Sequence, residues 1–264
     1  MKSNARPLAL VTGSSSGIGA NLARELAKDG HDLVLSARRV EPMQVLAEEL
    51  KALGANSTII AADLSTSGAA AALVQDIETR ALTVDVLINA AGLGANGRFD
   101  QSDPRRVSEM LQVNVVALTE LTRMLLPPMV KRGKGRVMLL ASTAGFQPGP
   151  QMAVYCASKA YVLSFGEAIA YELRHSGVTV TTLCPGATDT EFARVADAGS
   201  SALFKGLLPV MSAGDVARIG YQGLKAGRGV VITGLVNKIM ATSSRLSPTP
   251  LSLRIANWMM SAGK

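Results

Sequence analysis

The first residues whose types and spacing suggest a chemical function are three glycines near the N-terminus. Gly13, Gly17 and Gly19 follow a short apolar run and precede a helical pattern. Glycine permits a tight turn and a close approach of the backbone to a pyrophosphate, while the N-terminus of the next helix offers free N–H groups and a positive dipole end. A glycine turn without a ligand is the alternative, but the order of strand, glycines and helix favours a dinucleotide site.

Two arginines follow the second apolar run, at the position that selects between the nicotinamide dinucleotides. An acid there would accept hydrogen bonds from the ribose 2′-OH of NAD, whereas an arginine can accommodate the 2′-phosphate of NADP. The sequence reads Ser36-Ala37-Arg38-Arg39, with no acid in this stretch. Since a guanidinium binds a phosphate bidentately, we predict NADP(H), although a solvated arginine pair would show the same pattern.

A tyrosine, a lysine and a serine form the third candidate group. Tyr155 and Lys159 are four residues apart and share one face of a predicted helix. Such a pair alone is a frequent chance pattern. Ser142 precedes Tyr155 by 13 residues and stands at the end of a predicted strand. Together with the nucleotide turn, these side chains indicate a catalytic constellation.

Alternating strands and helices must position these residues. Seven apolar runs have the length of a strand buried on both faces: residues 8–12, 32–36, 57–61, 85–89, 136–141, 178–184 and 229–233. Helical patterns separate them: residues 21–28, 42–53, 67–80, 104–126, 153–174 and 213–225. We expect the fourth of these helices to end before Pro127 and Pro128, because proline cannot continue a helix.

The alternation predicts an α/β fold, a Rossmann-type doubly wound three-layer α/β/α sandwich with a mainly parallel seven-stranded sheet. A ligand of such a sheet binds outside the carboxyl ends of the strands. Because no linker divides residues 1–234, we expect one domain there and an extension over residues 235–264.

Together the motifs resemble the short-chain dehydrogenase/reductase family, in its compact single-domain branch that prefers NADP. The matching positions occur in family order and cover roughly residues 7–234: residues 12–19, Asp63, residues 89–92, Asn114, Ser142, Tyr155, Lys159, residues 185–186 and Thr190. The resemblance implies a nicotinamide-dependent oxidoreductase.

The resemblance also implies which residues contact NADP(H). They are Gly13, Ser15, Ser16, Gly17, Ile18, Gly19, Arg38, Arg39, Asp63, Leu64, Asn89, Ala90, Gly92, Tyr155, Lys159, Pro185, Gly186, Thr188 and Thr190. In this set Arg38 would bind the 2′-phosphate and Asp63 the adenine, Asn89 would lie beside the adenosine ribose, and Thr190 near the nicotinamide carboxamide. The alternatives are that Asp63 caps a helix and that Asn89 serves a turn.

Four residues would be catalytic by the same resemblance, which implies reversible reduction of a ketone or aldehyde. Tyr155 would donate the proton that the reduced carbonyl needs. A free tyrosine has a pKa of about 10, which Lys159 and the oxidised nicotinamide would lower. Ser142 would hydrogen-bond the substrate oxygen, and Asn114 would hold a water that links Lys159 to solvent. A surface position for Asn114 is the alternative.

Residues 187–212 stand where the family places its substrate lid. Apolar side chains are frequent there: Phe192, Leu203, Phe204, Leu207, Leu208, Val210 and Met211. With Leu93, Phe146 and Met152 as further pocket candidates, they indicate an apolar substrate such as a fatty-acyl, lipid-like or steroid-like carbonyl. Packing of the lid against the body or a partner subunit is an equal alternative.

The net charge of +7 comes entirely from the C-terminal segment, since seven basic and no acidic residues follow Asp215. The extension over residues 235–264 could contact another subunit, cover the active site or bind a membrane surface. Pro248 and Pro250 divide it into two pieces, which disfavours one long interfacial helix. We expect subunit or intramolecular packing rather than membrane contact, and a homodimer or homotetramer.

Composition excludes other classes of protein. Cys156 and Cys184 are the only cysteines, so there is no disulfide framework or zinc cluster, and we predict no metal site. No apolar run is long enough to span a membrane, and we expect a cytoplasmic protein. The basic tail lacks the interleaved aromatics of a nucleic-acid module. The main alternative to an enzyme is a non-catalytic NADP(H)-binding regulator or scaffold, which would not need all four catalytic residues.

Overall fold

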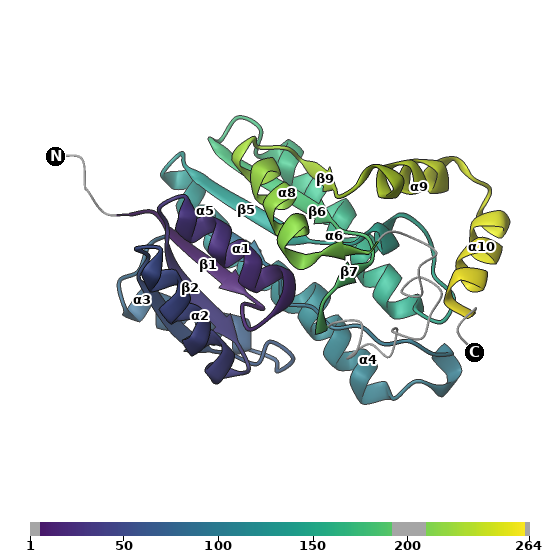
Figure 1. Cartoon of the computed structure of the whole chain (residues 1–264), viewed down its shortest axis with the longest axis horizontal. Helices are drawn as coiled ribbons and strands as arrows, with labels where there is room; N and C mark the ends of the chain where they lie inside the picture. The colour runs from purple at the N-terminus through teal and green to yellow at the C-terminus, as the bar shows by residue number, and fades with distance from the viewer. Residues whose placement is uncertain (1–5, 192–209, 262–264) are drawn as a thin grey trace.

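A seven-stranded parallel sheet forms the centre of the protein (Figure 1). The computed structural model describes residues 6–191 and 210–261. The strands are β1 (Leu8–Thr12), β2 (Asp32–Ala37), β3 (Ser57–Ala61), β4 (Val84–Asn89), β5 (Gly135–Leu140), β6 (Val178–Cys184) and β9 (Val230–Ile232). They lie in the order β3-β2-β1-β4-β5-β6-β9, and all neighbours are parallel. The order reverses between β1 and β4, so the predicted doubly wound fold is confirmed.

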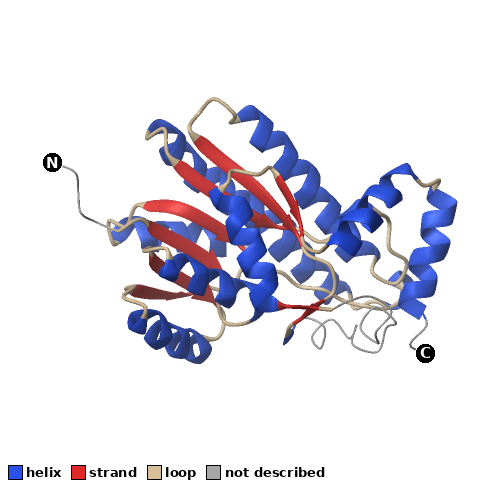
Figure 2. Ribbon diagram, turned by 45° about the horizontal axis from the view of Figure 1, so that its top comes forward, coloured by secondary structure: helices blue, strands red, loops and turns tan. Residues whose placement is uncertain are grey.

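Helices cover both faces of this sheet (Figure 2). One face carries α1 (Gly17–Lys28), α2 (Val40–Ala52) and α8 (Ala213–Lys225), and the other carries α3 (Ala69–Thr79), α5 (Leu118–Lys131) and α6 (Ala153–Glu172). In β1, Ala9 and Val11 pack into the first layer and Leu10 into the second. Because successive strand residues face opposite sides, a strand covered on both faces must be apolar throughout.

The helix that leads into Pro127 and Pro128 differs from the prediction. From α4 (Pro104–Leu111) the chain stays helical into α5, which continues across both prolines. Proline in a helix interior costs about 3 kcal/mol. Beyond the prolines, however, Met129 is fully buried and packs on Gly135, where an added Cβ would lie 2.7 Å from the Met129 Cβ. This packing keeps the last turn helical, so the predicted helix end was wrong.

The remaining described elements lie beyond the carboxyl ends of the strands. A short parallel pair joins β7 (Thr188–Asp189) to β8 (Met211–Ser212). The predicted lid runs between these strands, but its residues 192–209, with Phe192, Leu203, Phe204, Leu207 and Leu208, lie outside the described residues.

Two helices end the described chain, α9 (Leu235–Leu246) and α10 (Thr249–Ser261). They agree with the predicted division near Pro248, and Figure 1 shows them beyond β9, at the opposite end of the molecule from β1, β2 and α3. None of the described helices is long and apolar enough to cross a membrane.

Candidate active site

A cavity of about 520 Å³ lies at the carboxyl ends of the strands. Its walls come from the loops after β1 to β6, from α6, and from α9 and α10. The predicted site residues that line it are Gly13, Ser15, Ser16, Gly17, Ile18, Gly19, Arg38, Arg39, Asp63, Leu64, Ala90, Gly92, Ser142, Tyr155, Lys159, Pro185, Gly186, Thr188 and Thr190. Asn89 and Asn114 do not line the cavity.

The glycine turn is shaped to receive an anion. Gly13 has a φ of +67°, and a Cβ there would lie 2.8 Å from the Ala91 backbone. A Cβ at Gly19 would collide with the carbonyl of Gly13. The α1 helix starts after Ser16, whose side chain does not cap it, and its first turn holds no acid. The first N–H groups of α1 and its positive dipole end are therefore available to a phosphate, so the residues present fit a dinucleotide.

The part of the cavity wall that follows β2 and β3 distinguishes the two arginines. Arg39 Nη2 lies 2.6 Å from a carboxylate oxygen of Glu191, whereas Arg38 forms no salt bridge within the described part of the chain. Asp63 accepts hydrogen bonds from the Ser65 N–H and hydroxyl, at 3.1 and 2.7 Å. Burial raises the pKa of Asp63, but these hydrogen bonds and the charge of Arg38 outweigh it and hold the pKa below its usual value. Asp63 is thus an anionic hydrogen-bond acceptor, and the Arg38 guanidinium near it has no salt-bridge partner among the described residues.

The structure does not bring Asn89 to the cavity wall. Its amide Nδ2 donates to Thr122 Oγ1 at 3.0 Å and to the Leu118 carbonyl at 3.5 Å, so it points into α5. The neighbouring Ala90 and Ala91 N–H groups both donate to Thr12 Oγ1 at 3.2 Å. The backbone after Asn89 therefore forms the wall, and the Asn89 side chain fixes β4 to α5 from behind.

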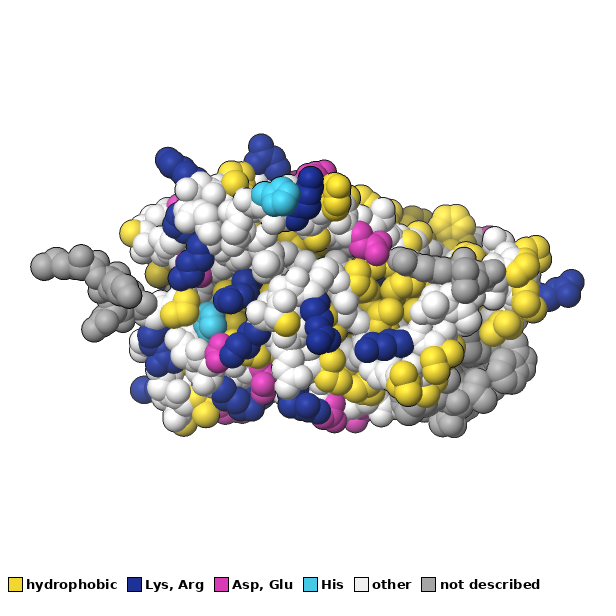
Figure 3. Space-filling model, turned by 90° about the horizontal axis from the view of Figure 1, so that it is seen from above, with side chains coloured by type: hydrophobic (Ala, Val, Ile, Leu, Met, Phe, Trp, Pro, Cys, Tyr) yellow, Lys and Arg dark blue, Asp and Glu magenta, His cyan; other side chains and the backbone are white. Residues whose placement is uncertain are grey.

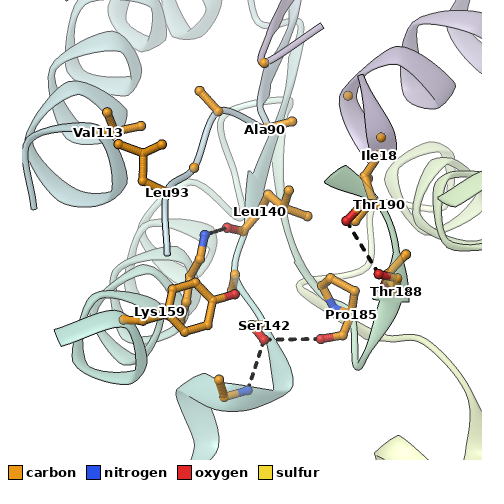
Figure 4. A pocket seen from close by; sticks show the side chains of 18 of the residues that line it. Ile18, Ala90, Leu93, Val113, Leu140, Ser142, Lys159, Pro185, Thr188 and Thr190 are labelled. Carbon is orange, nitrogen blue, oxygen red and sulfur yellow. Dashed lines mark hydrogen bonds between the residues drawn. The ribbon is translucent and has the colours of Figure 1, made fainter. Parts of the chain in front are cut away.

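Lys159 and Tyr155 are both buried in the cavity wall. Lys159 Nζ donates to the Leu140 carbonyl at 2.7 Å (Figure 4) and lies 5.8 Å from the centre of the Tyr155 ring. Burial lowers the pKa of Lys159 to about 8. Burial raises the pKa of Tyr155 to about 12, against the opposing effect of a hydrogen bond with Ser142. In the chain alone, loss of hydration dominates around the phenol, and the lowering expected from the oxidised nicotinamide stays a prediction.

Ser142 is held between two backbone segments. Its hydroxyl donates to the Pro185 carbonyl at 3.3 Å and accepts from the Ala144 N–H at 3.1 Å, as Figure 4 shows. It starts the 3₁₀ turn Thr143–Phe146. Gly145 in this turn sits directly on α6, where a Cβ would lie 2.6 Å from the Lys159 carbonyl. This contact, which the sequence did not reveal, packs the turn after Ser142 directly against the helix that carries Tyr155 and Lys159.

Asn114 is fully buried behind the cavity, which excludes the alternative of a surface position. It lies on a π-helical turn (Gln112–Ala117), a distortion that is frequent at functional sites. Its side chain accepts from the Leu93 N–H at 2.8 Å, and donates to the Leu93 carbonyl at 2.9 Å and to Ser158 Oγ at 3.0 Å. An added Cβ at Gly92 would lie 3.5 Å from both Asn114 Oδ1 and Lys159 Nζ. Asn114 therefore fixes the loop beside Lys159.

The C-terminal extension forms one end of the cavity wall, called the far end below. Residues of α9 and α10 line it: Asn237, Met240, Ala241, Ser244 and Ala256. Leu93 and Met152 line it as predicted, whereas Phe146 does not. The Asn237 amide fills the space that a Cβ on Gly186 would need, with its Cγ at 2.6 Å. The sequence left the extension open between three roles. No apolar stripe in the sequence indicated this arrangement, because Asn237 and Ser244 line the cavity while Leu235 and Ile239 are exposed.

Comparisons with known proteins now define the class of protein. The short chain dehydrogenase family matches residues 7–200 of the sequence. The chain therefore belongs to the short-chain dehydrogenase/reductase family of oxidoreductases, and the resemblance is confirmed. The ketoacyl reductase HetN of Nostoc sp. is 32% identical over 94% of this chain and 88% of its own. Sulfoacetaldehyde reductase of Chromohalobacter salexigens is 36% identical over 78% of this chain and 83% of its own.

Solved structures share the fold over most of the chain. A short-chain dehydrogenase from Sphingobium yanoikuyae in complex with NADPH has a TM-score of 0.79 at 31% identity, covering 90% of this chain and 92% of its own. The bulky-bulky ketone specific alcohol dehydrogenase from Comamonas testosteroni has a TM-score of 0.76 at 29% identity, covering 91% and 92%. A family member from Burkholderia phymatum in complex with NAD has a TM-score of 0.78 at 26% identity, covering 92% and 94%.

Proposed function

We propose that the protein is an NADP(H)-dependent carbonyl reductase that converts a ketone or aldehyde reversibly to an alcohol. One observation carries this proposal: Ser142, Tyr155 and Lys159 line the same cavity as the glycine turn. Similarity to a ketoacyl reductase and to a structure with NADPH supports it. The position of Arg38, without a salt bridge to any described residue, supports NADP over NAD.

The chain's own residues would handle the proton and the developing charge. NADP(H), when bound, supplies the hydride. A pKa of about 12 keeps the Tyr155 phenol protonated near neutral pH, so it can donate to the carbonyl oxygen. With a pKa of about 8, Lys159 stays cationic and stabilises the phenolate that Tyr155 becomes. Ser142 would hydrogen-bond the substrate oxygen as negative charge grows there.

Asn114 has a positioning role in this proposal. It holds the Leu93 backbone and Ser158, and Ser158 Oγ donates in turn to the Tyr155 carbonyl at 2.7 Å. These contacts fix α6 and the loop after β4 around Lys159. The water relay that the family resemblance implies stays a prediction.

An apolar substrate fits the far end of the cavity. Leu93, Met152, Met240, Ala241 and Ala256 line it. The Comamonas testosteroni neighbour is described as a bulky-bulky ketone specific alcohol dehydrogenase, which supports a bulky ketone as substrate.

The test is a panel of carbonyl compounds followed at the NADPH absorbance, with acyl chain length varied and sulfoacetaldehyde as a small charged member. We expect kcat/KM to rise by up to about fourfold per methylene buried. If NADPH binds tightly but no member of the panel consumes it, the protein is a non-catalytic binder and the proposal fails.

A further inference from the structure

The two C-terminal helices turn polar side chains inward. On α9, Asn237 and Ser244 line the cavity together with Met240 and Ala241. These positions follow the spacing i, i+3, i+4, i+7 of one helix face. On α10, Ser252 is buried, as is Ala256 four residues later. The inner faces of both helices therefore face the cavity or pack against the body of the protein.

The outer faces of the same helices carry large apolar side chains among exposed polar ones such as Thr242 and Ser243. On α9, Leu235 is 74% and Ile239 61% exposed, while on α10 Leu251 is 50% and Ile255 47% exposed. Asn237 and Ser252, by contrast, are each 5% exposed. Large apolar side chains at this exposure depart from the usual pattern of a surface helix, whose outer face is mostly polar. Figure 3 shows hydrophobic side chains gathered at this end of the molecule. Exposed apolar surface of this kind marks an interaction site.

Uncompensated positive charge accompanies these apolar residues. Lys238 and Arg254 are exposed on α9 and α10, and neither forms a salt bridge with a described residue. Two basic residues of α8, by contrast, are paired: Arg218 with Asp215 at 2.9 Å and Lys225 with Asp29 at 2.7 Å. No acidic residue follows Asp215 in the sequence, so these helices contain no partner for the two cations.

The absence of acids in this segment decides between two occupants of the apolar face. A second copy of the chain, packed symmetrically on it, would bring α9 and α10 against themselves and place cations near cations. An anionic lipid surface offers both an apolar layer and opposite charge. Amphipathic helices lie in that interface with apolar residues in the acyl boundary and Lys or Arg at the headgroups.

We propose that α9 and α10 form a docking surface for anionic membranes, with Leu235, Ile239, Leu251 and Ile255 inserted and Lys238 and Arg254 at the headgroups. Each helix is short and divided from the other by Pro248, so the pair lies on the bilayer. The inner faces of the same helices line the cavity, so docking places its far wall next to the lipid. Vesicle binding requires no turnover, so this proposal and the proposed function can fail independently.

The experiment is co-sedimentation of the full chain with vesicles of phosphatidylcholine alone or mixed with phosphatidylglycerol. We expect binding to the anionic vesicles that weakens with rising salt, and much weaker binding to phosphatidylcholine. Ile239→Asp/Ile255→Asp should lose binding. Lys238→Gln/Arg254→Gln, which leaves all apolar contacts in place, should weaken it by about thirtyfold. The matched control Val45→Asp changes a 63% exposed residue on α2 and should bind like the parent protein.

Circular dichroism and NADPH binding verify that each variant is folded. If the parent protein does not bind phosphatidylglycerol vesicles, the proposal is overturned. It is also overturned if Lys238→Gln/Arg254→Gln binds unchanged. Sedimentation velocity supplies a third decisive result: a dimer that Ile239→Asp dissociates would make this face a contact between copies.

Discussion

Gly145→Ala is the sharpest perturbation of the catalytic geometry that substitutes no catalytic residue. An added Cβ would lie 2.6 Å from the Lys159 carbonyl oxygen, 2.8 Å from its carbon and 3.0 Å from the Ala160 nitrogen. These are backbone atoms of α6 and cannot rotate away. Ordinary contact begins near 3.4 Å, so the turn that carries Ser142 must move from α6 by roughly half an ångström or more.

Such a shift separates Ser142 from Tyr155 without touching the glycine turn. A displacement of about 1 Å can cost about 10²-fold in rate, so we expect kcat to fall by tens to a hundredfold. Overpacking should also lower the free energy of unfolding by about 1–3 kcal/mol, which corresponds to a Tm lower by several degrees.

The assay combines steady-state kinetics, NADPH titration and thermal unfolding. Gly229→Ala is the matched control, because an added Cβ there meets no atom within 4 Å. We expect the control to keep the parent kcat and Tm. Parent-like kcat in Gly145→Ala would refute the idea that this contact sets the geometry of Ser142.

Three further predictions concern charge and packing. Because burial lowers the pKa of Lys159 from 10.5 to about 8, the unfolded chain holds that proton more tightly, and the contribution of Lys159 to the free energy of unfolding should rise by about 3 kcal/mol between about pH 8 and pH 10.5, read as the difference between the parent protein and Lys159→Met because buried Cys156 acts in the opposite direction. Lys159→Met should lack this rise in urea unfolding across that range, and an identical rise in both proteins would disprove the assignment. Arg38→Ala should weaken NADPH binding by about tenfold or more with NADH binding unchanged, whereas Arg39→Ala, at the arginine paired with Glu191, should have a smaller effect in fluorescence titration. Equal losses of NADPH affinity in the two variants would contradict the proposal that Arg38 rather than Arg39 binds the 2′-phosphate. Gly186→Ala should lower Tm by forcing the Asn237 amide aside, and it should lower Tm much less in an Asn237→Ala background, which by itself lacks the hydrogen bond to the Thr233 carbonyl. An equal decrease in Tm in both backgrounds would show that Gly186 and Asn237 do not compete for the same space.

The sheet could be predicted from sequence because its strands are buried on both faces. Each predicted strand agrees with the observed one to within a residue at either end, and α8 agrees at both ends. Local composition determines such elements. The helix end at Pro127 could not be predicted, since it depends on Met129 packing against Gly135, a contact between a helix and a strand.

In the candidate site, too, some features could be predicted from the sequence and others could not. The glycine turn and the Tyr155–Lys159 pair are local patterns, and the structure brings them to one cavity. The direction of the Asn89 side chain depends on α5, and the place of Asn237 depends on how the extension folds back. These arrangements arise from tertiary packing, which a single sequence pattern does not contain.

The central claim is that Tyr155 transfers the proton in a carbonyl reduction. Tyr155→Phe removes one hydroxyl and leaves the ring that packs beside Lys159. With a carbonyl that the parent protein reduces, we predict that kcat falls by about 10²–10⁴-fold while the Kd for NADPH changes little. Tyr155→Phe with intact NADPH binding and the parent kcat would contradict the account.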